Sequence, residues 1–322
     1  MKFRTEITLA PAASKIDQHS RILSLGSCFA EEVASKLSLS GVETLSNPLG
    51  VLFNPLSIEM ALERICRCEK VSEKELCQRG DVWFCYDTHG DFDGVCPKRV
   101  CEGINSALER AGEWLQRTDV VIVTLGTAWV YERSGRVVAN CHKMPAEEFV
   151  RRRLSVEEVV ASLKRTIELL APRRVILTVS PVRHLADGLE GNSLSKAILR
   201  VAAEEVSARD GRVSYFPAYE ILVDDLRDYR YYSDDMVHPS RVAVEYIWER
   251  FAESHLSREA VVAAERFAKL CEASSHRPLH PESEEYNRFR ATMRQRAEAL
   301  VAEFPDNKIA LSLVSFFAPT GK

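Results

Sequence analysis

A serine follows a glycine at the end of a strand-like apolar run near the start of the chain. The run is "RILSLG" at 21–26, Ser27 comes next, and "CFAEEVASKLSL" at 28–39 has apolar residues at helical spacing. A hydroxyl at this junction has two interpretations. Ser27 either caps the helix, as serine often does, or presents its oxygen as a nucleophile beside the positive end of the helix.

An aspartate and a histidine lie three residues apart in the loop "YYSDDMVHPS" at 231–240. A serine hydrolase needs an imidazole that takes the serine proton and a carboxylate that orients the imidazole. Asp235 and His238 are the residue types for these roles, and one loop can present both. With Ser27 they form a nucleophile, base and orienting group, which favours the nucleophile interpretation of Ser27.

Strand-like and helix-like segments alternate from residue 21 to residue 255, which predicts an α/β fold with a mostly parallel sheet and helices on both faces. Further strands are expected at 41–50, 119–127, 173–181 and 211–219. Helices are expected at 56–68, 98–117, 155–170, 192–209, 219–228 and 241–255, and hairpins at 82–94 and 128–140. Ligands of such sheets bind beyond the carboxyl ends of the strands, and Ser27 lies at one of these ends.

The chain from residue 257 onward is helical in pattern. We expect an α/β domain over 1–256 and a helical extension over 257–322 that packs on this domain. An apolar stripe within 282–304, formed by Tyr286, Phe289, Met293, Ala297 and Leu300, must be buried against the domain or another chain. The predicted oligomeric state is a monomer or weak homodimer.

Composition narrows the classes of partner. A net charge of −4 and a pI near 6.1 argue against nucleic acid or an anionic membrane as partner. No run approaches the roughly 18 apolar residues of a membrane span, and the N-terminal residues lack a signal-peptide core, so a cytoplasmic protein is expected. The basic run at 151–153 is expected at a solvated helix start, and Lys196 on a solvated helix face.

Nine cysteines occur in the chain, and six of them lie between residues 66 and 101. Structural zinc sites use paired C-x2–4-C spacings, which this cluster lacks, so no metal is predicted. The cysteines are expected to be reduced thiols with mostly structural roles. Cys28 is an alternative nucleophile because it stands next to Ser27 at a helix start.

The segment "LGSCFAEEV" resembles the defining motif of the GSCFA-domain proteins, which are similar to the SGNH/GDSL hydrolase superfamily. The resemblance extends through "NPLGVLFNPLSI", "TLGTAWVY", "SPVRHLADG" and "DDMVHPS" and covers about residues 1–260. It implies a three-layer α/β/α flavodoxin-like fold. It also implies Ser27 as the nucleophile and Asp235 and His238 as the Asp-x-x-His pair.

The superfamily resemblance further implies an oxyanion hole made of the nucleophile's own amide, a glycine amide and an asparagine side chain. Gly50 matches the glycine. The third block departs from the pattern, because "GTA" at 126–128 replaces Gly-x-Asn. Thr127 is one candidate for the missing donor, and Asn140 and His142 are the others.

The predicted function is a serine-dependent ester hydrolase that removes a small acyl group, such as acetyl, from a polar carrier such as a carbohydrate. No metal or organic cofactor is expected. Trp129 is a candidate for stacking on a sugar or acyl group, and Arg183 and His184 are candidates for an anionic substrate group. The alternative is a binding or scaffolding module on a hydrolase fold that has lost its activity.

Overall fold

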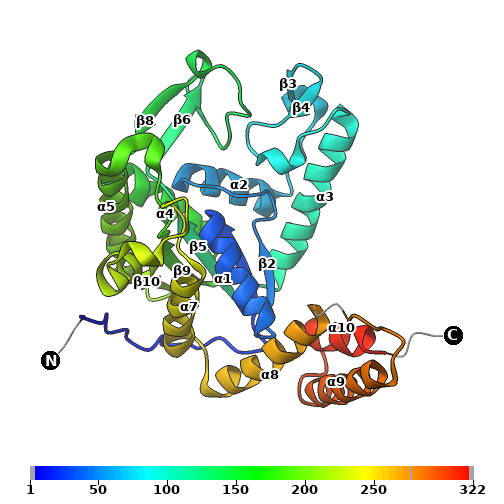
Figure 1. Cartoon of the computed structure of the whole chain (residues 1–322). Helices are drawn as coiled ribbons and strands as arrows, with labels where there is room; N and C mark the ends of the chain where they lie inside the picture. Colours follow the sequence, from blue (N-terminus) through cyan, green and yellow to red (C-terminus); the bar gives the residue numbers. More distant parts are fainter. Residues whose placement is uncertain (1–3, 276–277, 319–322) are drawn as a thin grey trace. The chain divides into compact units, whose positions relative to one another are not determined.

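A five-stranded sheet forms the centre of the α/β part of the chain (Figure 1). The computed structural model describes residues 4–275 and 278–318. In spatial order the strands are β2 (Glu43–Ser46), β1 (Arg21–Gly26), β5 (Val120–Leu125), β9 (Arg174–Val179) and β10 (Val213–Phe216). β9 pairs in parallel with both β5 and β10. The order 2-1-3-4-5 is that of flavodoxin-like doubly wound sheets, so the predicted fold class is confirmed.

Helices flank this sheet and close its core. They are α1 (Cys28–Leu39), α2 (Pro55–Arg67), α3 (Pro97–Gln116), α4 (Val156–Leu169), α5 (Gly188–Ser207) and α7 (Arg241–His255). α4 packs against both α2 and α5. Every residue of β5 is buried, which explains why this central parallel strand reads as a continuous apolar run. The segment expected as a helix at 219–228 forms a short turn, α6 (Ala218–Glu220), continued by a π-helix over Ile221–Leu226.

Two small antiparallel sheets lie above the main sheet in Figure 1. One is the hairpin β3 (Cys77–Arg79) and β4 (Val82–Phe84); the other contains β6 (Trp129–Arg133), β7 (Arg136–Val138) and β8 (Val150–Arg153). The hairpin predicted over 128–140 is confirmed by β6 and β7. The helix start predicted for the basic run is wrong. Arg151 and Arg153 belong to β8, where they stand opposite Tyr131 and Trp129 of β6.

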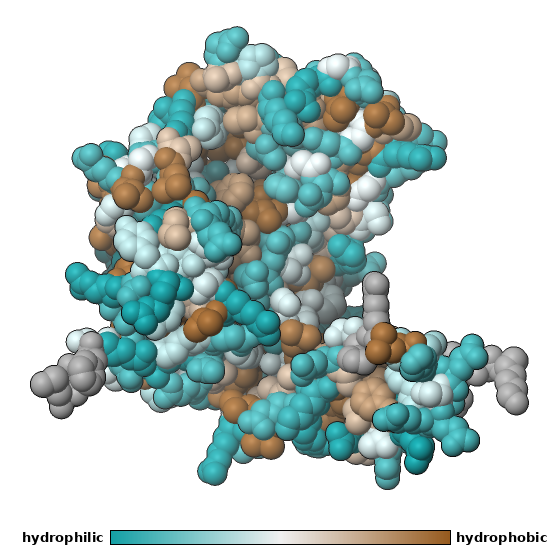
Figure 2. Space-filling view, viewed as in Figure 1, coloured by the Kyte–Doolittle hydropathy of each residue, from teal (hydrophilic) through white to brown (hydrophobic). Residues whose placement is uncertain are grey.

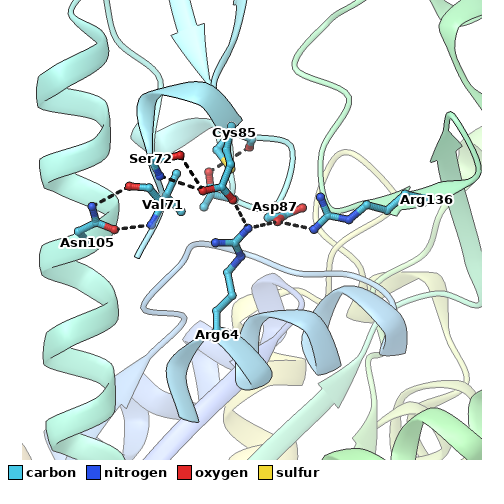
Figure 3. Close-up of polar contacts among 9 residues, drawn as sticks. Arg64, Val71, Ser72, Cys85, Asp87, Asn105 and Arg136 are labelled. Atoms are coloured by element: carbon cyan, nitrogen blue, oxygen red, sulfur yellow. Dashed lines mark hydrogen bonds and ion pairs between the residues drawn. The ribbon is translucent and has the colours of Figure 1, made fainter. Parts of the chain in front are cut away.

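An ionic network around the buried Asp87 carboxylate connects the β3–β4 region to α2 and β7 (Figure 3). The Asp87 carboxylate accepts hydrogen bonds from Arg64 at 3.0 Å and from Arg136 at 2.7 Å. Arg64 also pairs with Glu75 at 2.5 Å. The Asp87 side chain is only 7% exposed, so little water is available to replace these partners.

The chain divides into two compact units. The first contains 1–8, 23–32 and 45–247, and the second contains 9–22, 33–44 and 248–322, so the second takes in more of the chain than the expected extension at 257–322. Within the second unit, α8 (Arg258–Ser275), α9 (Glu284–Glu303) and α10 (Lys308–Phe316) share one apolar cluster. The predicted stripe of α9 is buried in this cluster through Met293, Ala297 and Leu300. Its burial partners therefore include α8 and α10.

The surface shown in Figure 2 mixes hydrophobic and hydrophilic residues without one broad apolar area. Among the described residues, no helix is both long enough and apolar enough to cross a membrane.

The end of β1 is set by the close approach of Gly26 to β5. Gly26 has a φ of +130°, and a Cβ atom built there would lie 2.1 Å from the Thr124 carbonyl oxygen. Its N–H donates to the Asn47 side chain at 2.9 Å, and its carbonyl accepts from the Leu52 N–H at 2.9 Å. Glycine is required here because any side chain would collide with the neighbouring strand. This contact fixes the backbone immediately before Ser27.

We expect Gly26→Ala to lower the free energy of unfolding by about 3 kcal/mol, because it adds both a backbone collision and an unfavourable φ. Gly135→Ala is the matched control: its φ is +78°, and nothing lies within 4 Å of the added Cβ. The control should lose about 1 kcal/mol, from φ alone. Urea unfolding of both variants measures the difference, and equal losses would contradict the collision.

We also expect Asp87→Asn to cost about 3 kcal/mol, because it removes the buried carboxylate that pairs with the largely buried Arg64 and with Arg136. Asp81→Asn, an exposed aspartate in the turn between β3 and β4, serves as the control and should change stability by no more than about 0.5 kcal/mol. Urea unfolding again gives both values. A similar small change in both variants would show that the network adds little.

Candidate functional site

Ser27 stands between β1 and α1 with a buried side chain that is 1% exposed. Its N–H donates to the Thr124 carbonyl at 3.1 Å. Its Oγ has no hydrogen-bond partner among the described residues, although it is buried. A capping serine would accept a bond from an N–H in the first helical turn. The cap interpretation of Ser27 is therefore wrong, and the hydroxyl is free for another partner.

Gly126 lies against Ser27, and Phe53 lies against Gly126. A Cβ built on Gly126 would lie 3.3 Å from Ser27 Cβ and 2.8 Å from the Phe53 carbonyl oxygen. That carbonyl accepts the N–H groups of Gly126 and Thr127, each at 2.8 Å. The loop over 47–53 hydrogen-bonds Gly26 and also contacts Gly126 at the end of β5. Both glycines lie next to Ser27.

Asp235 and His238 form a hydrogen-bonded pair in the loop before α7. The His238 Nδ1 lies 2.7 Å from Asp235 Oδ2, and the N–H groups of Val237 and His238 donate to Asp235 Oδ1 at 2.9 and 3.0 Å. These bonds, first that from the His238 backbone and then that from its ring, lower the pKa of Asp235 to about 2. The carboxylate therefore stays ionised and orients the ring through Nδ1, which leaves Nε2 for proton transfer.

His238 and the start of α1 line the same small cavity. Its lining residues are Cys28, Phe29, Glu32, Val182, His238, Pro239 and Val244. Both side chains of the Asp–His pair are about half exposed. The structure thus brings the predicted base to the residue that directly follows Ser27.

The Cys28 thiol is a poor candidate for the nucleophile. Burial raises its pKa above the ordinary value, although N–H groups at the helix start oppose the shift. The thiol therefore remains protonated near neutral pH, whereas cysteine nucleophiles react as thiolates.

Arg183 contacts the loop that carries the Asp–His pair. Its N–H donates to the Val237 carbonyl at 3.1 Å, and its Nη1 lies 3.4 Å from the Met236 carbonyl. The guanidinium carbon lies 3.8 Å from the centre of the Tyr232 ring. Arg183 therefore supports the loop that carries the Asp–His pair. This structural role was not predicted from the sequence, and binding of a substrate anion by Arg183 stays a prediction.

His184 is influenced by nearby positive charges, and its ring contacts Phe53. Burial, followed by the positive charges of Lys196, Arg151 and His238, lowers its pKa to about 4. The ring is neutral near pH 7, so it offers no positive charge to the substrate anion that it was expected to bind. Its Nε2 is buried without a partner among the described residues, and its ring contacts Phe53 edge-on at 5.8 Å.

Two of the predicted oxyanion donors, Gly50 and Thr127, have hydrogen-bond partners within the chain. The Gly50 N–H donates to the Asn47 carbonyl at 2.8 Å. The Thr127 hydroxyl lies 3.1 Å from Ser195 Oγ and accepts the Trp129 N–H at 3.1 Å. These bonds stabilise the loops around Ser27, and the Gly50 N–H is engaged by an acceptor within its own loop in this arrangement.

Asn140 and His142 are held in a separate cluster near β4. The Asn140 side chain accepts the His142 N–H at 2.8 Å. The His142 ring is fully buried, stacks on Phe84 at 4.4 Å, and bonds the Cys85 carbonyl through Nε2 at 2.9 Å. His142 therefore has a structural role, and its buried ring is not accessible to a substrate.

Trp129 begins β6, two residues beyond Thr127, and its side chain is partly exposed. Its Nε1 lies 3.4 Å from the Gly191 carbonyl, and the Arg151 guanidinium lies 5.1 Å from the ring. The ring is thus positioned by α5 and β8, and part of it remains open to solvent. Stacking of this ring on a substrate stays a prediction.

Three residues of α5 that sequence reasoning missed hold the loops of the site. Asn192 Oδ1 accepts the His184 N–H at 3.0 Å, and Ser195 Oγ accepts the Ala128 N–H at 2.7 Å. Lys196 is buried, and its Nζ bonds the Gly126 and Ser180 carbonyls. The expectation that Lys196 is solvated is wrong. Polar residues at spacings of three and four within an otherwise apolar helix face are the signal that marks them.

The comparisons with known proteins identify a family for most of the chain. The model of the GSCFA family matches residues 21–251, which includes Ser27, Asp235 and His238. No curated protein matches the chain. A solved structure from Streptococcus pneumonia that bears the name of a platelet activating factor is similar at 12% identity and a TM-score of 0.39; the match covers 73% of this chain and 83% of that one. The family match spans most of the chain, and the protein belongs to the GSCFA family.

Proposed function

We propose that the protein is a serine-dependent ester hydrolase that works by acyl transfer. The observation that carries the proposal is the buried Ser27 hydroxyl, which has no partner among the described residues and stands at a strand end beside Gly126. A buried hydroxyl without a protein partner is unfavourable, and water or a bound molecule can complete it. The oriented Asp235–His238 pair near the start of α1 supplies the base.

The reaction follows from these groups. The Ser27 Oγ attacks the ester carbonyl carbon, and its proton passes to His238 Nε2. The tetrahedral intermediate collapses when the carbon–oxygen bond to the alcohol breaks, and the alcohol leaves with the proton from His238. Water then repeats the sequence on the acyl-serine, and releases the acid and free Ser27. The positive end of α1, which starts at Cys28, favours the negative charge on the intermediate.

The proposed substrate is a small acyl group on a polar carrier, such as an acetylated carbohydrate. The partly exposed Trp129 ring, flanked by arginine, provides an aromatic face with a polar rim. Such surfaces suit sugar rings. The resemblance of the Ser27 and Asp235–His238 motifs to SGNH hydrolases supports carboxylic esters as the class.

A second candidate is a binding module that retains the fold without turnover. The observation that favours it is the engagement of the expected oxyanion donors, since Gly50 and Thr127 bond other groups. Loss of one such donor lowers enzymatic rates by about 10²–10³.

A panel of p-nitrophenyl acetate, butyrate and palmitate tests the proposal on the wild type, Ser27→Ala and Cys28→Ala. We expect preference for acetate and a loss of at least about 10³-fold in kcat/KM for Ser27→Ala. Cys28→Ala should keep at least about a tenth of the activity, because the thiol is protonated. Hydrolysis that survives in Ser27→Ala would contradict the nucleophile, and preference for palmitate would contradict the small acyl group. A well-folded wild type without any turnover would favour the binding module.

A further inference from the structure

Lys196 is a buried lysine bonded only to main-chain oxygens among the described residues. It lies in the middle of α5 and is 1% exposed. Its Nζ donates to the Gly126 carbonyl at 2.6 Å and to the Ser180 carbonyl at 2.7 Å. These residues directly follow β5 and β9, so one side chain holds the carboxyl ends of two neighbouring strands.

The titratable groups that face Lys196 come from three other segments and are neutral near pH 7. Cys28 lies at the start of α1, His184 in the loop after β9, and Tyr219 in α6 with its ring centre 5.8 Å from Nζ. Burial raises the pKa of Cys28 and of Tyr219 and lowers that of His184 to about 4. No carboxylate in the described part of the chain forms an ion pair with Lys196.

The pKa of Lys196 lies close to neutral pH. Burial lowers its pKa to about 7, so ammonium and amine are both populated at neutral pH. Hydrogen bonds from an ammonium are about twice as strong as those from a neutral amine. Loss of the proton consequently weakens the hold on both carbonyls.

The Gly126 peptide connects Lys196 to the nucleophile. Lys196 holds its carbonyl, its N–H donates to the Phe53 carbonyl, and the position of its missing Cβ lies 3.3 Å from Ser27 Cβ. A shift of Gly126 would move the backbone against which Ser27 packs. A misplacement of about 1 Å at a reacting group can cost about 10²-fold in rate.

We propose that Lys196 is a positioning residue for Ser27, whose buried ammonium fixes the Gly126 and Ser180 carbonyls at the ends of two strands. This role rests on the proposed function of Ser27. It predicts that the reactivity of Ser27 falls as the pH rises through about 7, where Lys196 loses its proton.

Three variants separate this role from a purely structural bond. Lys196→Met keeps an unbranched side chain but has no donor, whereas Lys196→Gln keeps a donor without the charge. Lys164→Met makes the same change at an exposed lysine of α4 and serves as the control. The readouts are kcat and KM for p-nitrophenyl acetate and the rate of labelling by a fluorophosphonate, each from pH 5.5 to 9.

We expect Lys196→Met to lower kcat and the labelling rate by about 10²-fold, with KM within about threefold, and to lose the fall in rate above pH 7. Lys196→Gln should recover part of kcat but not the alkaline fall, and Lys164→Met should match the wild type. An unchanged kcat in Lys196→Met, or the same alkaline fall in it, overturns the proposal. If Lys196→Met does not fold, Lys196→Gln and the wild-type profile decide: a wild type without an alkaline fall near pH 7 also overturns it.

A stability measurement distinguishes failure of this inference from failure of the proposed function. The unfolded chain keeps the lysine proton up to about pH 10.5, but the folded chain loses it near pH 7. The unfolded state thus binds more protons in this interval, so the contribution of Lys196 to the free energy of unfolding increases with pH. The difference between wild type and Lys196→Met in urea unfolding should grow in favour of the wild type from pH 7 to pH 9.

The stability difference and the kinetic profile test different parts of the account. A constant difference across this range overturns the titrating lysine whether or not esters are hydrolysed. A growing difference together with Ser27-dependent turnover and an unchanged kcat in Lys196→Met overturns only the positioning role. Turnover that does not depend on Ser27 overturns the proposed function, and with it the role of Lys196 in positioning a nucleophile.

Discussion

The close approach of Gly26 to the Thr124 carbonyl is the constraint on which the site depends. Because no side chain fits there, β1 can lie against β5 up to its last residue, and the chain turns at once into α1. Ser27 occupies that turn, too deep for solvent and without the bond that a capping residue would make. The glycine before the serine is therefore as necessary to the arrangement as the serine itself.

The loops around Ser27 are held chiefly by main-chain bonds and by one helix. The loop over 47–53 binds Gly26 through Asn47 and Leu52 and binds the end of β5 through Phe53. α5 contributes Asn192, Ser195 and Lys196, which contact the segments after β5 and β9. Helical side chains at spacings of three and four share a face, so a single turn of α5 supports both segments. The positions of the reacting groups thus depend on residues that never contact the substrate.

The sequence predicted the local features of this arrangement better than the tertiary ones. The alternation of strands and helices and the hairpin at Ser134 and Gly135 were predictable because each depends on a short stretch of residues. The basic run at 151–153 was misassigned because its pairing with β6 determines its conformation. Lys196 was misassigned because a lysine on a helix is usually solvated, although it shares the buried face of α5 with Asn192 and Ser195. The surroundings of the oxyanion candidates could not be predicted either, because Gly50 and Asn140 are positioned by partners that no sequence motif specifies.

The central claim is that Ser27, and not the adjacent Cys28, is the group that attacks a carbonyl carbon. The direct measurement is the mass of the protein after reaction with a fluorophosphonate, followed by fragmentation of the peptide that contains both residues. The account predicts one adduct, located on Ser27, absent from Ser27→Ala and formed more slowly in His238→Gln, which has no base. An adduct on Cys28, or labelling of Ser27→Ala at the wild-type rate, would contradict it.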